Sequence, residues 1–319
     1  MFEKPTPRIE SAERERKIRF ESAEFSIPKE GKEISEDSVL VDNGNMVFGV
    51  FDGIGGHSAG EIASKIAKEI LEENSEAIEI SNDQRAASPQ QISEKLSAKL
   101  IDADFRIYKE STEDPTKRKM GTTASVVKLF ENPEGKMFAI IANVGDSRVY
   151  MLSAGKLKRL TKDDHTLKAF GLPAEDIEHL EKKLDSAKSI NELNDIEIAA
   201  FRTRNTISNY LGRENGAVVR AAIIEPSAGD KIIITSDGIH DNLTGKEIEA
   251  IVKENLPVKN ISTKLVRAAK DRSKELDAET GERHLRAKRD DMSVIVIEIE
   301  PRPGRVSIED EITQKIVRK

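Results

Sequence analysis

The residues Met46-Val47-Phe48-Gly49-Val50-Phe51-Asp52-Gly53 form an apolar run that ends in an acidic residue and a glycine. A shorter apolar run, Asp37–Val41, precedes it and is separated from it by Asp42-Asn43-Gly44-Asn45. An Asn-Gly pair between two such runs is typical of a tight β-hairpin, because both residues tolerate positive φ. The pattern therefore predicts two antiparallel strands, the second of which ends at Asp52-Gly53.

Helical patterns follow the predicted hairpin. Ser58 and Glu61 have the spacing of a capping box, and isoleucines then recur every four residues along one helical face. A second helix is expected from Ser88-Pro89 to about Lys109, because a Ser-Pro pair is typical of a helix start and apolar residues again recur every four positions. Two helices are thus expected between the hairpin and the next strand.

Strand patterns dominate the rest of the chain. Strands are expected at Thr122–Leu129, Lys136–Asn143, Arg148–Leu152, Val218–Ile224, Lys231–Thr235 and Met292–Ile299. The first three are joined by short turns and are expected to form a meander. Helical spacing recurs in Leu172–Ala199, after a capping box at Thr244 and Glu247, and in Lys259–Leu276. This order predicts an α+β fold with mainly antiparallel sheets and helices packed outside them, not a Rossmann-type alternation.

The composition excludes several classes of protein. The 319 residues contain no cysteine, which rules out disulfides, thiolate metal ligands and cysteine nucleophiles. The apolar runs are far shorter than the ~20 residues that span a bilayer, and the charged start of the chain does not match a signal peptide. The net charge of -7 gives no reason to expect nucleic acid as a partner. We therefore expect a cytoplasmic protein with neither membrane insertion nor nucleic-acid binding.

Five aspartates lie at or beside predicted strand ends or in a tight turn: Asp37, Asp52, Asp146, Asp237 and Asp290. Taken singly, each is more often a turn or surface residue than a ligand. If their carboxylates converge, they cannot all be ionised at neutral pH without a counter-charge, because like charges raise each other's pKa. Divalent cations would supply that charge, and oxygen ligands without cysteine suit Mg²⁺ or Mn²⁺.

Seven segments, in order along the chain, together resemble the metal-dependent serine/threonine protein phosphatases of the type-2C, or PPM, family. They are Ser35-Glu36-Asp37-Ser38, Val50-Phe51-Asp52-Gly53-Ile54-Gly55-Gly56-His57 with Gly60-Glu61, Gly121-Thr122-Thr123-Ala124, Ala142-Asn143-Val144-Gly145-Asp146-Ser147-Arg148, Leu160-Thr161 through Asp164-His165, Ser236-Asp237-Gly238 and Asp290-Asp291-Met292-Ser293. Each segment alone is weakly specific, whereas seven in order are very specific. The Asp-Gly-x-Gly-Gly-His form is similar to that of bacterial members.

The resemblance implies an α-β-β-α sandwich of two mainly antiparallel sheets flanked by helices. It also implies a binuclear Mn²⁺ or Mg²⁺ centre at one end of the strands. On the family pattern, Asp52 bridges the two ions, and the carbonyl of Gly53 binds one of them. Asp237 and Asp290 hold the other ion.

The resemblance further implies supporting ligands and a mechanism. Glu36 and Asp37 would orient waters bound to the ions, and Asp146 with Asp237 would supply a third, weaker ion site. A water activated by two ions would attack phosphoserine or phosphothreonine directly, without a phosphoenzyme. Asp52, Asp237 and Asp37 are the predicted catalytic residues. The implied partners are a phosphorylated protein substrate and an opposing serine/threonine kinase.

The domain organisation is predicted from the extent of the resemblance. Residues 34–300 are expected to form the phosphatase domain, residues 1–33 an extended or partly disordered N-terminal arm, and residues 301–319 a charged tail. Residues 166–212 correspond to the flap, a variable segment that borders the active site in the family. Its helical, charged part is either a docking element for a substrate or regulator, or an additional helix without such a role.

Several positions depart from the family pattern. Lys32 stands where the family has its phosphate-binding arginine, so it either keeps that charge without the bidentate fork or is a solvated loop residue. Ile54 stands where animal members have a histidine proposed as general acid, so His57 is either that acid or a residue of the helix start. Asp291 replaces the usual asparagine and is either an alternative ligand or a hydrogen-bonded residue before the strand.

Two other functions are consistent with the sequence. Lys32 and Ile54 are compatible with a catalytically weak or inactive regulatory module of the same fold, although the retained aspartates argue against it. A metal-dependent phosphodiesterase would use the same ions, but the chain lacks a basic groove pattern. Arg202 and Arg204, which follow the flap helices, either assist an anionic substrate or have surface roles.

Overall fold

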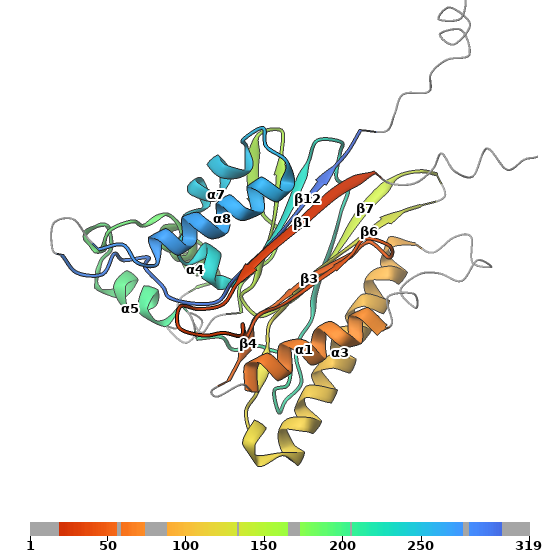
Figure 1. Ribbon diagram of the computed structural model, residues 1–319, viewed down its shortest axis with the longest axis horizontal. Helices are drawn as coiled ribbons and strands as arrows, with labels where there is room; N and C mark the ends of the chain where they lie inside the picture. The colour runs from red at the N-terminus through yellow and green to blue at the C-terminus, as the bar shows by residue number, and fades with distance from the viewer. Residues whose placement is uncertain are drawn as a thin grey trace, which may run out of the picture.

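Two five-stranded sheets form the centre of the computed structural model (Figure 1). The structure describes residues 19–55, 59–73, 88–132, 134–164, 173–204, 206–276 and 281–301. The strand orders are β1-β12-β11-β8-β9 in one sheet and β10-β7-β6-β3-β2 in the other. Neighbouring strands within both sheets are antiparallel, as the sequence predicts.

The predicted hairpin and the predicted central strands are confirmed with small shifts of their ends. The first sheet contains β1 (Phe20–Ile27), β12 (Met292–Ile299), β11 (Lys231–Thr235), β8 (Arg148–Ser153) and β9 (Lys156–Arg159). The second sheet contains β10 (Arg220–Ile224), β7 (Met137–Val144), β6 (Ala124–Glu131), β3 (Val47–Phe51) and β2 (Ser38–Asp42). A further pair is formed by β4 (Gly53–Ile54) and β5 (Gly121–Thr122).

The alternation of side chains along β3 shows how the layers are held together. Phe48 and Val50 are fully buried in the core between the two sheets. Val47 and Phe51 point to the opposite face and are buried against the helices. Because successive strand residues face opposite sides, a wholly apolar strand such as β3 is suited to a position with a layer on each side.

The helices cover the outer faces of the sandwich, with α7 and α8 on one side and α1 and α3 on the other (Figure 1). Their bounds are α1 (Ala59–Glu73), α3 (Pro89–Glu113), α6 (Asp237–His240), α7 (Gly245–Val252) and α8 (Val258–Arg272), with a 3-10 turn η2 (Pro115–Lys117) after α3. The helix start predicted at Ser88 and the capping box predicted at Thr244 are both formed, and Ser88 also forms a capping box with Gln91. The predicted cap residue Ser58 lies outside the described residues.

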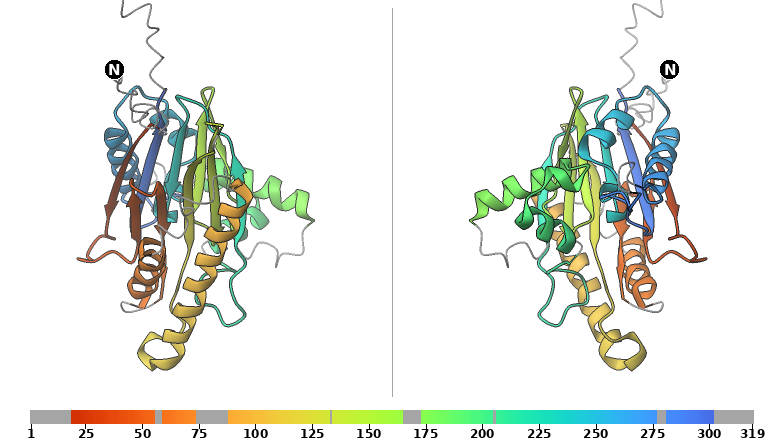
Figure 2. Two further views of the ribbon diagram at one scale, coloured as in Figure 1. Left: turned by 90° about the vertical axis from the view of Figure 1, so that its right-hand side faces the viewer. Right: turned by 90° about the vertical axis from the view of Figure 1, so that its left-hand side faces the viewer.

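The flap region projects from the side of the sandwich and has a small core of its own (Figure 2, green). It contains α4 (Ala174–Ser186), the 3-10 turn η4 (Ile190–Glu192) and α5 (Asp195–Thr203). Leu180, Leu184 and Phe201 are among the apolar side chains that these helices bury against each other. The predicted helical character of the flap is therefore confirmed.

The prediction that residues 1–33 form an arm is wrong for Phe20–Ile27. These residues form β1, which pairs along its whole length with β12. The strand lies at the sheet edge, and its residues Glu21, Glu24 and Ser26 are exposed. These polar residues alternate with Ala23, Phe25 and Ile27, which pack against the helix-side core, so the segment does not read as an apolar strand in the sequence. Edge strands commonly have such polar faces.

The predicted meander is also corrected. The strand expected at Arg148–Leu152 does not pair with β7 but with β11, in the other sheet. The chain changes sheets in the turn Gly145-Asp146-Ser147, where Gly145 has a φ of 96°, a value that favours glycine. The turn therefore places Asp146 where the two sheets meet.

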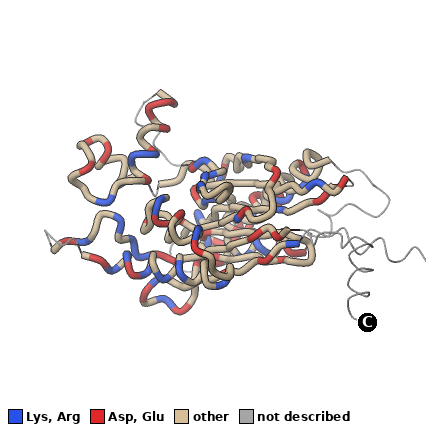
Figure 3. Tube along the Cα trace, turned by 90° about the horizontal axis from the view of Figure 1, so that it is seen from above, with Lys and Arg blue, Asp and Glu red and all other residues tan. Residues whose placement is uncertain are grey.

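The charged residues give the surface a mixed character. Figure 3 shows lysines, arginines, aspartates and glutamates interspersed along the trace. Within the described part of the chain, no helix is both long and apolar enough to cross a bilayer.

Candidate metal centre

The five predicted aspartates meet at one end of the sandwich. Asp52 follows β3, and Asp37 precedes the paired strand β2. Asp237 follows β11, and Asp290 precedes the paired strand β12. The turn with Asp146 leads into β8, whose first residue pairs with the last residue of β11. Since antiparallel neighbours place the end of one strand beside the start of the next, the strand register brings all five aspartates to the same end of the sandwich.

Two glycines allow the segments that bear these aspartates to approach closely. A Cβ on Gly53 would lie 2.3 Å from the carbonyl oxygen of Gly60 and 2.5 Å from that of Glu36. A Cβ on Gly238 would lie 1.9 Å from the carbonyl oxygen of Asp291. Any larger residue would push these backbones apart, so the glycines after Asp52 and Asp237 are required by packing.

The Gly121-Thr122-Thr123-Ala124 segment holds the backbone of Asp52. The Asp52 N–H donates to Oγ1 of Thr123 (3.0 Å), and its carbonyl oxygen accepts from the N–H of Thr123 (2.9 Å) and from Oγ1 of Thr122 (3.0 Å). Thr123 Oγ1 also lies 2.7 Å from Oγ of Ser147, which follows Asp146. These bonds link the positions of Asp52 and Asp146 across the two sheets.

The carboxylates lie close enough together to raise each other's pKa values. Burial, followed by repulsion from Asp237, Asp37, Asp290 and Asp146, raises the pKa of Asp52 well above its usual range. Burial is also the largest cause for Asp37, whose pKa rises to about 8, and for Asp237, whose pKa rises to about 6. Clustered acids with raised pKa values are characteristic of sites that bind cations or perform acid–base chemistry.

The donor set fits a hard divalent cation. Both carboxylate oxygens of Asp37 and Oδ1 of Asp237 are buried without a hydrogen bond of good geometry. The hydroxyls of Ser293 and Ser236 lie near enough to Asp37 to moderate its pKa. Buried, unpaired carboxylate oxygens are costly unless a cation joins them, and an all-oxygen set suits Mg²⁺ or Mn²⁺. As they stand in the described chain, however, no three acidic or histidine side chains are spaced to surround one ion.

A lysine occupies part of this site, which sequence reasoning did not identify. The ammonium of Lys288 is hydrogen-bonded to Asp237 and lies 3.1 Å from a carboxylate oxygen of Asp241 and 3.1 Å from one of Asp290. Burial alone would lower the pKa of Lys288, but Asp237, Asp241 and Asp290 raise it well above its usual value. Its position two residues before Asp290 was the available sequence clue.

The predicted residues Glu36 and Lys32 pair with each other at the edge of the site. Lys32 Nζ lies 2.8 Å from a carboxylate oxygen of Glu36, and the Lys32 side chain is 41% exposed. Hydrogen bonding to Glu36, against a smaller effect of burial, raises the pKa of Lys32. Lys32 is thus near the carboxylate cluster and accessible from solvent, in a position compatible with contact to a bound anion.

Asp291 has the second of its two predicted roles, that of a hydrogen-bonded residue before the strand. One of its carboxylate oxygens accepts from the N–H of Lys29 (2.5 Å) and the other from the N–H of Glu36 (2.8 Å). The side chain therefore fixes the loop that leads to Asp37. This role uses both oxygens of Asp291.

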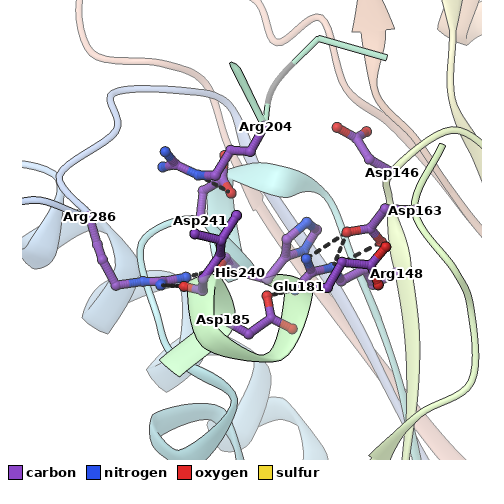
Figure 4. Close-up of a pocket in the computed structure, with 10 residues that line it drawn as sticks. Asp146, Arg148, Asp163, Glu181, Asp185, Arg204, His240, Asp241 and Arg286 are labelled. Carbon is purple, nitrogen blue, oxygen red and sulfur yellow. Dashed lines mark hydrogen bonds and ion pairs between the residues drawn. The ribbon is translucent and has the colours of Figure 1, made fainter. Parts of the chain in front are cut away.

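Arginine side chains connect the flap to the site, around a cavity of about 30 Å³ (Figure 4). Arg204 donates to Asp241 at 3.0 Å and stacks on Phe201. Arg148 forms an ion pair with Asp163 (2.6 Å), and Asp146 also lines the cavity. Arg204 therefore has a structural role, whereas Arg202 lies exposed at the end of α5.

The prediction for His57 is not tested, whereas another histidine, His240, lies beside the site. His57, the alternative general acid, lies outside the described residues. His240 is buried and shares a hydrogen bond of 2.9 Å with the Thr235 hydroxyl. Burial, together with the nearby Arg148, lowers the pKa of His240 well below its usual value, so this imidazole is neutral.

Comparisons with known proteins agree with the fold and the motifs. The family described as Protein phosphatase 2C matches residues 10–169, half of the chain. Protein phosphatase PhpP of Streptococcus pneumoniae is 25% identical over 228 residues, which cover 71% of this chain and 80% of PhpP.

Solved structures show the same fold. The crystal structure of the Mycobacterium tuberculosis serine/threonine phosphatase PstP/Ppp is similar with a TM-score of 0.65 and 22% identity, over 88% of this chain and 99% of that one. The catalytic domain of PstP in complex with two manganese ions gives a TM-score of 0.63 and 22% identity, over 88% and 99% of the two chains. Because the family model matches half of its length, and the aspartates of the family motifs meet at one site, this chain belongs to the protein phosphatase 2C family.

Proposed function

We propose that the protein is a metal-dependent serine/threonine phosphatase that hydrolyses phosphoserine and phosphothreonine in proteins. The observation that supports this most directly is the convergence of five aspartates at one end of both sheets, where both carboxylate oxygens of Asp37 and Oδ1 of Asp237 are buried without a hydrogen bond of good geometry. PhpP and PstP, which are similar to this chain, are named as phosphatases. Their names indicate the reaction class, and the carboxylate cluster indicates that the reaction would use bound divalent cations.

The chain's own residues divide the site into two sides. We assign Asp52, the carbonyl of Gly53, Asp37 and Glu36 to one side, and Asp237 and Asp290 to the other. Asp52 interacts electrostatically with carboxylates of both sides, Asp37 on one and Asp237 and Asp290 on the other, so it is the residue that would hold both ions.

When bound, two divalent cations lower the pKa of a coordinated water and neutralise charge that develops on the phosphoryl group. Mn²⁺ is supported by the PstP complex with two manganese ions, and Mg²⁺ by the all-oxygen donor set. A third ion at Asp146 and Asp237 is part of the proposal. Asp146 is buried beside Asp237, and burial and the charge of Asp237 raise its pKa well above the usual value.

The metal dependence can be tested on the whole chain. We expect phosphopeptide hydrolysis that requires Mn²⁺ or Mg²⁺ and stops in excess chelator, with monoesters strongly preferred over diesters. Hydrolysis should be followed by phosphate release from a phosphothreonine peptide and from a bis-ester of matched leaving group. Undiminished turnover in chelator would contradict the proposal. Tight phosphopeptide binding without turnover would favour the inactive module, and faster cleavage of the diester would favour a phosphodiesterase.

Lys32 is the proposed contact for the substrate phosphate. Lys32→Ala should raise KM for a phosphopeptide about tenfold with little change in kcat, because the lysine lies at the rim of the site and acts on binding. Lys32→Arg should restore or lower KM, since arginine can bind a phosphate with two hydrogen bonds. Steady-state kinetics at saturating Mn²⁺ measures both. An unchanged KM in Lys32→Ala would identify Lys32 as a solvated loop residue.

The cellular context follows from the same proposal. The substrate would be a protein phosphorylated by a serine/threonine kinase that opposes this enzyme. A cytoplasmic location is part of the proposal and is compatible with a cysteine-free chain.

A further inference from the structure

The backbone of Lys288 is fixed so that its side chain enters the carboxylate cluster. The N–H of Lys288 donates to Oδ1 of Asn242 (3.0 Å), and its carbonyl oxygen accepts from Nδ2 of the same asparagine (2.9 Å). Nδ2 of Asn242 also donates to the carbonyl oxygen of Gly238 (2.8 Å). Asn242 is fully buried. The lysine and the helix that begins at Asp237 are therefore joined as one rigid unit.

The ammonium lies among the carboxylates of one side of the metal centre. It bonds to Asp237 and lies 3.1 Å from Asp290, the two ligands assigned to that side, while only 16% of the side chain is exposed. Among the described residues, no cation is placed against Asp37 as Lys288 is against Asp237, and the groups nearest its buried oxygens are the neutral hydroxyls of Ser293 and Ser236. The two sides of the centre thus differ in charge before any ion binds.

We propose that Lys288 is a resident counter-cation, which neutralises the Asp237 and Asp290 side of the centre in the metal-free protein and must be displaced when an ion binds there. The inference rests on the proposed metal centre. Two like charges a few ångströms apart repel strongly in a partly buried site, so the ammonium and an ion cannot share both carboxylates. Binding on this side is therefore weaker than binding on the side of Asp52 and Asp37.

The structure supplies a place for the displaced ammonium. A carboxylate oxygen of Asp241 lies 3.1 Å from Nζ of Lys288, and Asp241 is itself held by Arg204. Asp241 is not among the assigned ligands. A rotation of the flexible lysine side chain can release Asp237 and Asp290 while the contact with Asp241 is kept.

The test is Mn²⁺ titration of the metal-free full-length chain by isothermal calorimetry, with Lys288→Met as the main variant. Methionine keeps most of the side-chain volume and removes the charge. We expect the weaker Mn²⁺ step to tighten by about tenfold or more, because its competitor is gone. Lys288→Arg, which keeps the charge, should stay within about threefold of the wild type.

Lys29→Met is the matched control. It removes one positive charge 4.0 Å from Asp290, but the Lys29 side chain is 41% exposed, so its effect on the Mn²⁺ dissociation constant should stay within about threefold. An equal or weaker Mn²⁺ affinity in Lys288→Met overturns the inference while leaving the metal centre intact. Failure of Mn²⁺ to bind either chain contradicts the metal centre as well.

A folding control covers the case in which the neutral variant is unstable. If Lys288→Met is unfolded in chelator, the inference requires that Mn²⁺ restores its far-ultraviolet circular dichroism, because the ions then replace the missing charge. A variant that stays unfolded in millimolar Mn²⁺ would show that Lys288 serves packing alone and would overturn the inference.

Discussion

Asp52→Asn is expected to lower kcat/KM for a phosphopeptide by about a thousandfold, or about 4 kcal/mol of transition-state stabilisation. The amide has one oxygen and no charge, so it cannot bridge two ions as a carboxylate does. Steady-state kinetics across a range of Mn²⁺ concentrations will show whether added metal recovers any of the loss. The control is Asp102→Asn, which changes an exposed carboxylate on α3 and should keep full activity.

The same variant should not be destabilised in the metal-free state. In the folded chain the pKa of Asp52 is raised well above 3.8, the value of an unperturbed aspartate. The native state therefore binds the proton of the Asp52 carboxyl group more tightly than the unfolded chain does. Ionisation therefore costs stability as pH rises above the unfolded value. In chelator, Asp52→Asn should melt at the same temperature as wild type at acidic pH and at a higher one at pH 8.

Either of two results would contradict this account of Asp52. One is activity within tenfold of the wild type. The other is a lower melting temperature than wild type in chelator at pH 8, which would mean that Asp52 supports the fold and not an ion.

Arg286→Met is expected to lower the free energy of unfolding by about 3–5 kcal/mol. Arg286 is 2% exposed. Its guanidinium donates to four backbone carbonyl oxygens, those of Leu184 (2.9 Å), Ala187 (3.2 Å), His240 (2.7 Å) and Leu243 (3.4 Å). Methionine fills part of the volume but leaves these buried acceptors without a donor, and each such acceptor costs free energy.

Urea unfolding of the metal-free protein measures this effect. Arg283→Met changes an exposed arginine in the same loop and should alter stability by about 0.5 kcal/mol or less. A loss below about 1 kcal/mol for Arg286→Met would show that water entering the neighbouring cavity satisfies the carbonyl groups.

Local patterns were sufficient to predict most elements and the carboxylate cluster. The hairpin between β2 and β3, the helix start at Ser88, the capping box at Thr244 and the strand over Met292–Ile299 depend on neighbours in sequence, and all are present. In the hairpin turn, however, the positive φ is at Met46 and not at the Asn-Gly pair. The position of the aspartates at strand ends likewise required only the order of the strands. The match of these residues to a known family pattern added the expectation that the strand ends share one edge.

Features that depend on distant partners could not be predicted in this way. β1 was missed because its partner β12 lies at the other end of the described chain, and nothing near Phe20 indicates that pairing. The change of sheet at Gly145 was missed because a short turn between apolar strands usually makes a hairpin. Lys288 was missed because its role depends on three carboxylates, of which Asp237 and Asp241 are about fifty positions earlier in the chain.

The pairing of β1 with β12 also limits the order in which the chain can fold during synthesis. The sheet of β2, β3, β6, β7 and β10 is complete in sequence at Ile224. The other sheet lacks a strand until Ile299 has been made, so β1 and β11 each present an unpaired edge until then. Contacts so distant in sequence form slowly, and exposed strand edges are prone to aggregation. Among the described strands, β1 is therefore made first and has no partner until β12, the last of them, has been made.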